Sequence, residues 1–320
     1  MTARIGFVGT GGIANHHMRT IAQISEARMA AFCDVVLSKA QSAASTYGGN
    51  AYDNFVRMYD SEKLDAVYIC LPPFAHGDQE LEAVRRGLPI FVEKPVATTV
   101  QKAEEILAAI QKEGVVNAVG YHWRSMDITA RAREHLEGQA VGFALGSWTG
   151  GMPGVSWWRV LAESGGQMVE QTTHIFDLAR YLLGEAKSVH ALARTGLMKG
   201  VENYTVHDAS VTNILFASGA VASITSACML NTGGYVGLDL YLKEQVLRLD
   251  SRNLTVEKPT GKEVFYLGNN PTLEEDTAFI RAVQSGDPSG IRSPYSDAVK
   301  TLKLTLAATQ SAIEGRVVDL

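Results

Sequence analysis

Short apolar runs alternate with helix-like stretches over residues 3–121, and this alternation constrains the fold more than any other feature. Five runs are typical of buried strands: "ARIGFVG", the end of "SEARMAAFCD", "LDAVYICLPP", "LPIFVEKP" and "VVNAVGY". The segments between them predict helices over residues 11–24, 36–47, 75–87 and 99–114. Apolar strands separated by amphipathic helices form parallel sheets with helices on both faces. We therefore predict an N-terminal α/β domain over residues 1–121, with a doubly wound parallel sheet.

The pattern changes after residue 121. Helices are expected over residues 128–136, 168–183, 272–284 and 296–314, and a strand near 142–148. Residues 187–267 contain successive short alternating runs with turn residues between them, which favours an antiparallel sheet. We predict that residues 122–320 form an α+β domain with a large, mainly antiparallel open sheet. An exposed sheet face of that size favours packing against another subunit, as a homodimer or homotetramer.

Composition excludes several classes of function. The chain has 320 residues, a net charge of −5 and a pI near 5.9, so nucleic acid and anionic membranes are poor partners. No apolar run approaches the roughly 20 residues of a membrane helix, and a strand begins almost at once where a signal peptide would lie. Cys33, Cys70 and Cys228 are isolated, which argues against disulfides and thiolate zinc sites and favours a reducing cytoplasm.

A glycine-rich turn follows the first expected strand and opens the first helix. In "IGFVGTGGIA", Gly9 permits a tight turn, Gly11 lets a pyrophosphate approach the backbone, and Ala14 allows close helix–sheet packing. The helix N-terminus then faces the phosphates. We expect the cofactor to contact this turn at Gly9, Thr10, Gly11, Gly12 and Ile13. The alternative is a tight turn with a purely structural role.

Asp34 ends the second expected strand, where a carboxylate binds the adenosine ribose hydroxyls and repels a 2′-phosphate. Val35 follows it, in place of the arginine or serine that would suit that phosphate. The sequence therefore favours NAD over NADP. Lys39 is the one residue that points the other way, unless it is only a solvated helix charge.

Two further expected strands end in residues of chemical interest. In open α/β sheets, ligands bind beyond the carboxyl ends of the strands. Leu71, Pro72 and His76 follow one strand, where they would form a wall near the cofactor, although a histidine that starts a helix is as often structural. Glu93 and Lys94 end the next strand, ahead of Pro95. A cation there would polarise a substrate oxygen and stabilise a developing alkoxide. A strand-end salt bridge is the alternative.

The glycine turn, Asp34, "LPPFAH" and above all "EKP" resemble the Gfo/Idh/MocA family of oxidoreductases. "SGGQMVEQTTHIFDLARYLLG", residues 164–184, is similar to the family's second signature, and "EGRVVDL" to its usual ending. The resemblance implies a Rossmann domain followed by a mainly antiparallel α/β domain, with the active site between them. It also implies NAD(P)-dependent oxidation of sugars, cyclic polyols or related compounds.

The second signature brings three ionisable residues together. Glu170, His174 and Asp177 are spaced i, i+4, i+7, which places them on one face of the helix expected over 168–183. The resemblance implies that His174 is the acid/base beside the reacting hydroxyl, a role that suits imidazole. The family usually has aspartate where this chain has Glu170, so Glu170 either tunes His174 or contacts substrate. In one alternative, the two carboxylates only hold the helix in place. In another, the three residues bind a metal ion, although we expect no metal.

Aromatic residues gather in two stretches near the expected domain junction. Aromatic rings stack on the C–H faces of sugars and polyols, and packing between domains is the alternative. The residues expected to contact substrate, besides Asp177, are Tyr121, Trp123, Arg124, Trp157 and Trp158.

The leading hypothesis is a dehydrogenase in which Lys94 stabilises the substrate oxygen and His174 takes the hydroxyl proton. The cofactor supplies the redox chemistry. A glycosidase that retains NAD and oxidises its substrate transiently is a second hypothesis. A non-catalytic sugar or dinucleotide sensor is a third, and the presence of both Lys94 and His174 argues against it.

Overall fold

The computed structural model describes residues 2–320, which form two compact units. Unit 1 contains the chain up to His122 together with Asn270–Val299, and unit 2 contains Trp123–Asn269 and Lys300–Leu320. The sequence analysis placed its one boundary after residue 121. The return of residues 270–299 to unit 1 was not expected, because the sequence analysis assigned everything after residue 121 to the second domain.

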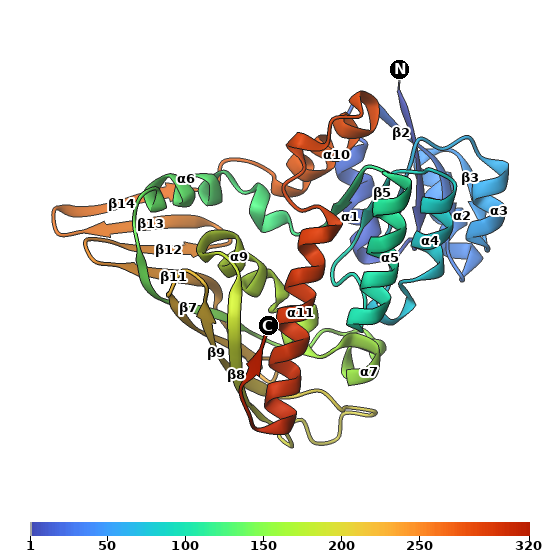
Figure 1. Cartoon of the computed structure of the whole chain (residues 1–320). Helices are drawn as coiled ribbons and strands as arrows, with labels where there is room; N and C mark the ends of the chain where they lie inside the picture. Colours follow the sequence, from blue (N-terminus) through green and yellow to red (C-terminus); the bar gives the residue numbers. More distant parts are fainter. Residues whose placement is uncertain (1) are drawn as a thin grey trace. The chain divides into compact units, whose positions relative to one another are not determined.

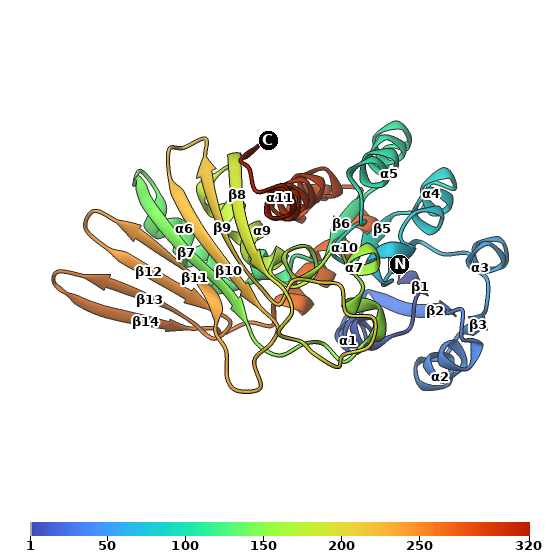
Figure 2. The same cartoon turned by 90° about the horizontal axis from the view of Figure 1, so that it is seen from below.

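Unit 1 is built on a six-stranded parallel sheet, sheet A, with the order β3-β2-β1-β4-β5-β6. Its strands are β1 (Ala3–Val8), β2 (Ala27–Cys33), β3 (Asn50–Tyr52), β4 (Ala66–Ile69), β5 (Ile90–Val92) and β6 (Asn117–Val119). Its helices are α1 (Gly12–Ile21), α2 (Leu37–Tyr47), α3 (Phe55–Ser61), α4 (Asp78–Arg85), α5 (Val100–Glu113) and α10 (Pro271–Ser285). Figure 2 shows α1 and α2 on one face of the sheet and α4 and α5 on the other. The predicted doubly wound Rossmann sheet is confirmed.

The sequence analysis missed β3 and α3. Strand β3 is only three residues long, and it pairs with the end of β2 from Ala31 to Cys33. Helix α3 spans seven residues and begins where the Asn54 side chain accepts a hydrogen bond from the Arg57 N–H. Both elements are too short to give a periodic signal of their own.

Helix α10 lies beside α1 in unit 1 (Figure 1). Phe279 and Ile280 are fully buried in the same apolar cluster as Phe7 and Tyr68 of sheet A. The Tyr68 ring stands edge-on to Phe279, with the ring centroids 5.5 Å apart. This buried aromatic contact explains why the chain returns to unit 1 after residue 269.

Unit 2 is built on a nine-stranded sheet, sheet B, with the order β14-β13-β12-β11-β7-β10-β9-β8-β15. Its strands are β7 (Val141–Thr149), β8 (Ala186–Arg194), β9 (Ala209–Phe216), β10 (Val221–Ala227), β11 (Val236–Leu242), β12 (Val246–Asp250), β13 (Asn253–Lys258), β14 (Gly261–Tyr266) and β15 (Val318–Asp319). Among the strands that the structure describes in sheet B, only β7 and β10 pair in parallel. The predicted mainly antiparallel open sheet is confirmed, with β14 inside the expected range 187–267, whereas β15 was not expected.

Helices α6 (Asp127–Leu136) and α9 (Thr173–Leu183) pack on sheet B (Figure 2). Gly146 of β7 makes the close approach of α9 possible, because a Cβ atom there would lie 2.7 Å from Cγ2 of Ile175. On the opposite face, β9 exposes alternate side chains, among them Val211 and Leu215. Sheet B therefore has one covered face and one open, partly apolar face.

The single helix expected over residues 168–183 is interrupted. A short helix α7 (Leu161–Ser164) is followed by α8 (Gln167–Glu170), and α9 begins only at Thr173. The N–H groups of Gln171 and Thr172 both bond to the Gln167 carbonyl, which ends α8. The sequence analysis placed Glu170, His174 and Asp177 on one continuous helix, and this was wrong, because Glu170 belongs to α8 and the other two to α9. Helix α11 (Tyr295–Glu314) closes the chain before β15.

Across residues 2–320, every helix is either too short or too polar to cross a lipid bilayer.

Candidate active site

The carboxyl ends of the strands in sheet A meet along one edge. The last residues of the strands pair directly in the register: Val8 with Cys33, Val8 with Ile69, Ile69 with Val92, and Val92 with Val119. The residues that follow them therefore emerge side by side. They are Gly9, Asp34, Leu71, Pro72, Glu93, Lys94, Gly120 and Tyr121. Sheet A thus brings together every cofactor-binding segment that the sequence predicted.

The glycine turn after β1 has two kinds of glycine. Gly9 has a φ of 83°, and a Cβ atom there would lie 2.3 Å from the Cys70 carbonyl oxygen, so the backbone itself requires glycine. Gly11 and Gly12 are exposed, and a Cβ atom at either would meet no atom within 4 Å. Helix α1 starts here without a side-chain cap on its first N–H groups. An open, uncapped helix start fits the pyrophosphate of a dinucleotide.

Asp34 is tied to this turn. Its Oδ2 accepts hydrogen bonds from the backbone N–H and the hydroxyl of Thr10, both at 2.9 Å, and its Oδ1 accepts one from the Val36 N–H at 2.9 Å. The half-buried carboxylate is held rigidly next to the glycine turn. Thr10 therefore acts in this structure as a support for Asp34.

His76 is buried after β4 and held by Glu80, with Nδ1 2.5 Å from Oε1 of that carboxylate. Glu80 is fully buried, and its other oxygen accepts the Gly77 N–H at the start of α4. Nε2 of His76 has no hydrogen-bond partner within residues 2–320. A buried ring nitrogen left without a partner is a candidate ligand contact.

Glu93 and Lys94 follow β5, with Glu93 buried and Lys94 half-buried. The Lys94 N–H donates to Oε2 of Glu93 at 3.1 Å, and the Lys94–Pro95 peptide bond is cis. Gly120, after β6, forms a wall beside the carboxylate, because a Cβ atom there would lie 2.5 Å from Oε1 of Glu93.

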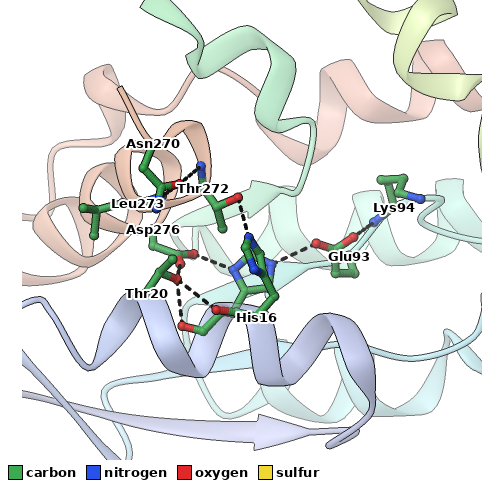
Figure 3. A network of polar contacts seen from close by, with 9 residues as sticks. His16, Thr20, Glu93, Lys94, Asn270, Thr272, Leu273 and Asp276 are labelled. Carbon is green, nitrogen blue, oxygen red and sulfur yellow. Dashed lines mark hydrogen bonds and ion pairs between the residues drawn. The ribbon is translucent and has the colours of Figure 1, made fainter. Parts of the chain in front are cut away.

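His17 and Asp276 complete this cluster, and the sequence analysis identified neither. Figure 3 shows Asp276 with Glu93 and Lys94. The buried imidazole of His17 contacts Asp276 with Nδ1 and Glu93 with Nε2. A signal for His17 was present, because it lies on the stripe of α1 that buries Ala14, Met18 and Ile21, and a histidine there needs polar partners. Asp276 lies 259 residues further along the chain and gave no such signal.

In unit 2, His174 is buried in the first turn of α9, where its ring stacks on Trp148 with centroids 5.6 Å apart. Trp148 lies on β7, so the sheet fixes the plane of the imidazole. Glu170 at the end of α8 accepts a 2.7 Å hydrogen bond from the indole N–H of Trp158. Trp158 is fully buried, so in this structure its ring packs in a core and its N–H holds Glu170.

Asp177 and Arg124 bind each other. Nε and Nη2 of Arg124 donate to the two carboxylate oxygens at 2.7 and 2.6 Å, and the Thr301 hydroxyl donates to Oδ1 at 2.8 Å. Both partners of this bidentate pair are buried. Breaking such a pair on one side costs roughly 3–5 kcal/mol. Within unit 2, the visible role of Asp177 is therefore to anchor α9.

The remaining predicted substrate contacts differ in exposure. Trp123 is buried in the apolar cluster of unit 2, whereas Trp157 is half-buried and packs beside Trp158. Tyr121 is buried in unit 1, directly after β6. Of these aromatic side chains, Trp157 is the one that is partly exposed to solvent. Within residues 2–320, no three His, Cys, Asp or Glu side chains are arranged to hold a metal ion.

Comparison with known proteins agrees with this geometry. The family described as oxidoreductases with an NAD-binding Rossmann fold, Gfo/Idh/MocA, matches residues 3–121, and its C-terminal domain matches residues 131–247. Inositol 2-dehydrogenase of Rhizobium meliloti is 26% identical over all of this chain and all of its own. D-glucoside 3-dehydrogenase of Escherichia coli is 28% identical over 71% of each chain.

A solved structure of levoglucosan dehydrogenase, in complex with NADH and levoglucosan, shares the fold. Its TM-score is 0.90 at 20% identity, over 100% of this chain and 99% of that chain. The two family domains, taken with the glycine turn, Asp34 and Lys94 at one edge of sheet A, show that this chain belongs to the Gfo/Idh/MocA family of NAD-binding oxidoreductases.

Proposed function

We propose that this protein is an NAD-dependent dehydrogenase that transfers hydride between the nicotinamide and a hydroxyl-bearing carbon of a sugar or cyclic polyol. The observation that carries the proposal is the position of Lys94 directly after β5, on the sheet edge that also holds the glycine turn and Asp34. Relatives named for action on inositol and glucosides support the substrate class.

We assign cofactor binding to residues of unit 1. Residues of both units are assigned roles toward the substrate. Residues of the glycine turn, Asp34 and His76 would hold the dinucleotide, which when bound supplies the hydride chemistry. Lys94 stabilises negative charge as it develops on the substrate oxygen. His174, its ring fixed by Trp148, accepts the hydroxyl proton, and Trp157 offers an aromatic face to the substrate.

NAD is the proposed physiological cofactor, in preference to NADP. The support is the rigid carboxylate of Asp34, which three hydrogen bonds hold in place and which would repel a 2′-phosphate. Lys39, the one residue that could favour NADP, is exposed in the first part of α2.

The test is to incubate the purified protein with NAD and a panel of inositols, glucosides and anhydrosugars, and to record absorbance of the reduced nicotinamide. Sustained formation of NADH with at least one compound supports the proposal. Product release without net NADH, or no turnover with any compound in either direction, would contradict it. Lys94→Ala should abolish most of this activity, and Lys112→Ala, an exposed change on α5, serves as its matched surface control.

We further propose that the open face of sheet B joins subunits in a homo-oligomer. It carries exposed apolar side chains on neighbouring strands, including Phe143, Leu145, Val211, Leu215 and Val221. A groove over β7–β10 is lined by several of them.

For the cellular location we propose the cytoplasm, supported by three buried free thiols, Cys33, Cys70 and Cys228.

A further inference from the structure

His17 lies between the two buried carboxylates of Asp276 and Glu93, which Figure 3 labels. Its Nδ1 is 2.8 Å from Oδ1 of Asp276 on α10, and its Nε2 is 2.9 Å from Oε1 of Glu93 after β5. His17 and Asp276 are 0% exposed, and Glu93 is 4% exposed. The rings of Tyr68 and Phe91 lie against the imidazole, with centroids 5.4 and 5.0 Å away. Water is therefore excluded from the pair of contacts.

This geometry fixes the charge of His17. An ionised carboxylate can only accept hydrogen bonds, so two carboxylates on one ring require that both ring nitrogens donate. Only the imidazolium does this. Burial opposes the positive charge, but Asp276 and Glu93 outweigh it and raise the pKa of His17 well above its usual 6.5. For Glu93, burial is likewise outweighed, mainly by the hydrogen bond from His17, and its pKa is lowered.

The imidazolium also fixes the Glu93 carboxylate in space. Oε1 is bound by His17, Oε2 accepts the Lys94 N–H at 3.1 Å, and Gly120 closes the third side. A hydrogen bond from Thr20, 2.5 Å from Oδ2 of Asp276, holds the far carboxylate. A continuous chain of contacts thus runs from α10 through α1 to the backbone of Lys94.

We propose that His17 is a positioning residue for Lys94. As an imidazolium held by Asp276, it locks Glu93 against Gly120, and Glu93 in turn fixes the backbone from which the Lys94 side chain projects. The inference rests on the proposed function in one respect, the catalytic role of Lys94. Within unit 1, the titratable groups that interact electrostatically with His17 or Glu93 are Asp276 and Glu275 from α10, His16 from α1, Cys70 after β4, and Lys94 and His122 from strand-end loops, and the Tyr68 ring contacts His17.

Two substitutions disturb Glu93 from opposite sides. His17→Gln removes the positive charge, and the amide that replaces the ring donates from one side only, so it cannot donate to Glu93 and Asp276 from opposite sides as the imidazolium does. Gly120→Ala leaves His17 intact but places a methyl group 2.5 Å from Oε1 of Glu93. The matched controls are Arg19→Gln, an exposed change on the same helix, and Gly290→Ala, where the nearest atom is 4.0 Å away. If His17→Gln fails to fold, Gly120→Ala carries the test.

The first readout is the single-turnover rate of hydride transfer at saturating NAD and substrate. We expect both target variants to lose about 10²-fold, the loss typical of a catalytic group displaced by about 1 Å, while the Kd for NAD changes less than about twofold. The controls should keep the wild-type rate. A wild-type rate in folded His17→Gln and Gly120→Ala would overturn the inference, as would a loss confined to NAD affinity or Tm.

A second readout does not depend on activity. Lysines are methylated reductively with 13C, and the Lys94 resonance is assigned by its absence in Lys94→Arg. It should move in both target variants and in neither control. An unmoved resonance overturns the positioning role even if the enzyme is active. A moved resonance in a protein that oxidises no compound of the panel supports the positioning role and contradicts the proposed function instead.

Discussion

At the scale of single residues, the environment of Lys94 decides what its ammonium can do. The carboxylate of Glu93, next to it in the chain, is held by a buried histidine and by the Lys94 N–H itself. Fixed charges that need no reorganisation during the reaction stabilise developing charge far better than mobile ones do. We therefore expect the side chains around Lys94 to matter for the rate more than for binding.

Lys94→Ala and His174→Ala should each lower kcat about 10²–10⁴-fold, the range typical of lost acid/base or electrostatic groups. NAD affinity should survive both changes, because the pyrophosphate is assigned to the glycine turn. Single-turnover hydride transfer with a confirmed substrate is the measurement. If Lys94→Ala transfers hydride at the wild-type rate, Lys94 is structural.

Asp34→Ala should weaken the preference for NAD over NADP by about tenfold or more, equivalent to ~1.4 kcal/mol. NAD itself should also bind less tightly, because Thr10 loses its carboxylate support. Titration of both cofactors, with Lys39→Ala as the comparison, measures this. The assignment fails if wild-type protein binds NADP more tightly, or if only Lys39→Ala changes the preference.

Local order along the chain explains which residues could be predicted. Asp34 and Lys94 directly follow apolar strands, so the rule for strand ends placed them at one edge of the sheet. His17 and Asp276 meet across 259 residues. Their pairing depends on how α10 packs, which no local pattern specifies. The roles of Trp158 and Arg124 were also hidden, because burial and an ion pair are properties of the folded unit.

At the scale of elements, the signature helix is the clearest lesson. Apolar and polar residues recur with helical spacing through residues 168–183, yet α8 ends at Glu170 and α9 begins at Thr173. Glu170, before the break, accepts a hydrogen bond from Trp158, and α9, after it, packs closely over Gly146. Tertiary packing of this kind overrides a periodic pattern, so the pattern predicted the helix but not its interruption.

Gly146→Ala should destabilise unit 2 by about 1–3 kcal/mol, because the added methyl group meets Cγ2 of Ile175 at 2.7 Å in a filled core. Gly142→Ala, on the same strand, meets only the Tyr241 carbonyl at 3.5 Å and is the control. Urea denaturation of both variants gives the comparison. Equal stability of the two would mean that α9 can shift without cost.

The contact between α1 and α10 should make stability depend on pH in a defined way. A raised pKa of His17 contributes stability that is present at low pH and is lost as pH rises through that pKa. A lowered pKa of Glu93 contributes stability above its usual 4.5 that is lost as pH falls through the lowered value. The two contributions are both fully present between about pH 4.5 and 6.5, the ordinary pKa values of the two groups.

Within that window, His17→Gln should lower the free energy of unfolding by about 3–5 kcal/mol, the cost of breaking a buried ion pair. The difference from wild type should shrink on both the alkaline and the acid side. Denaturation at a series of pH values measures it, with Arg19→Gln on the same helix as the reference. A difference that does not change with pH would show that His17 is neutral.

At the scale of the whole molecule, the open face of sheet B predicts self-association. Val211→Glu places a charge among its apolar side chains and should shift the mass measured by light scattering toward that of the 34.5 kDa chain. Ile313→Glu, an exposed change on α11, should leave the mass unchanged. Wild-type protein with a mass near 34.5 kDa in dilute solution would contradict the proposal.

Residues 270–299 belong to unit 1 although they are synthesised after nearly all of unit 2. At roughly 5–20 residues per second, a ribosome needs on the order of ten seconds to pass from the end of β6 to Asp276. During that time Glu93, one partner of His17, has been synthesised, but its second partner Asp276 and the core residue Phe279 have not. The core of unit 1 therefore stays incompletely buried while sheet B is synthesised. A stop codon or a fusion junction placed after residue 121 would leave unit 1 permanently without residues 270–299.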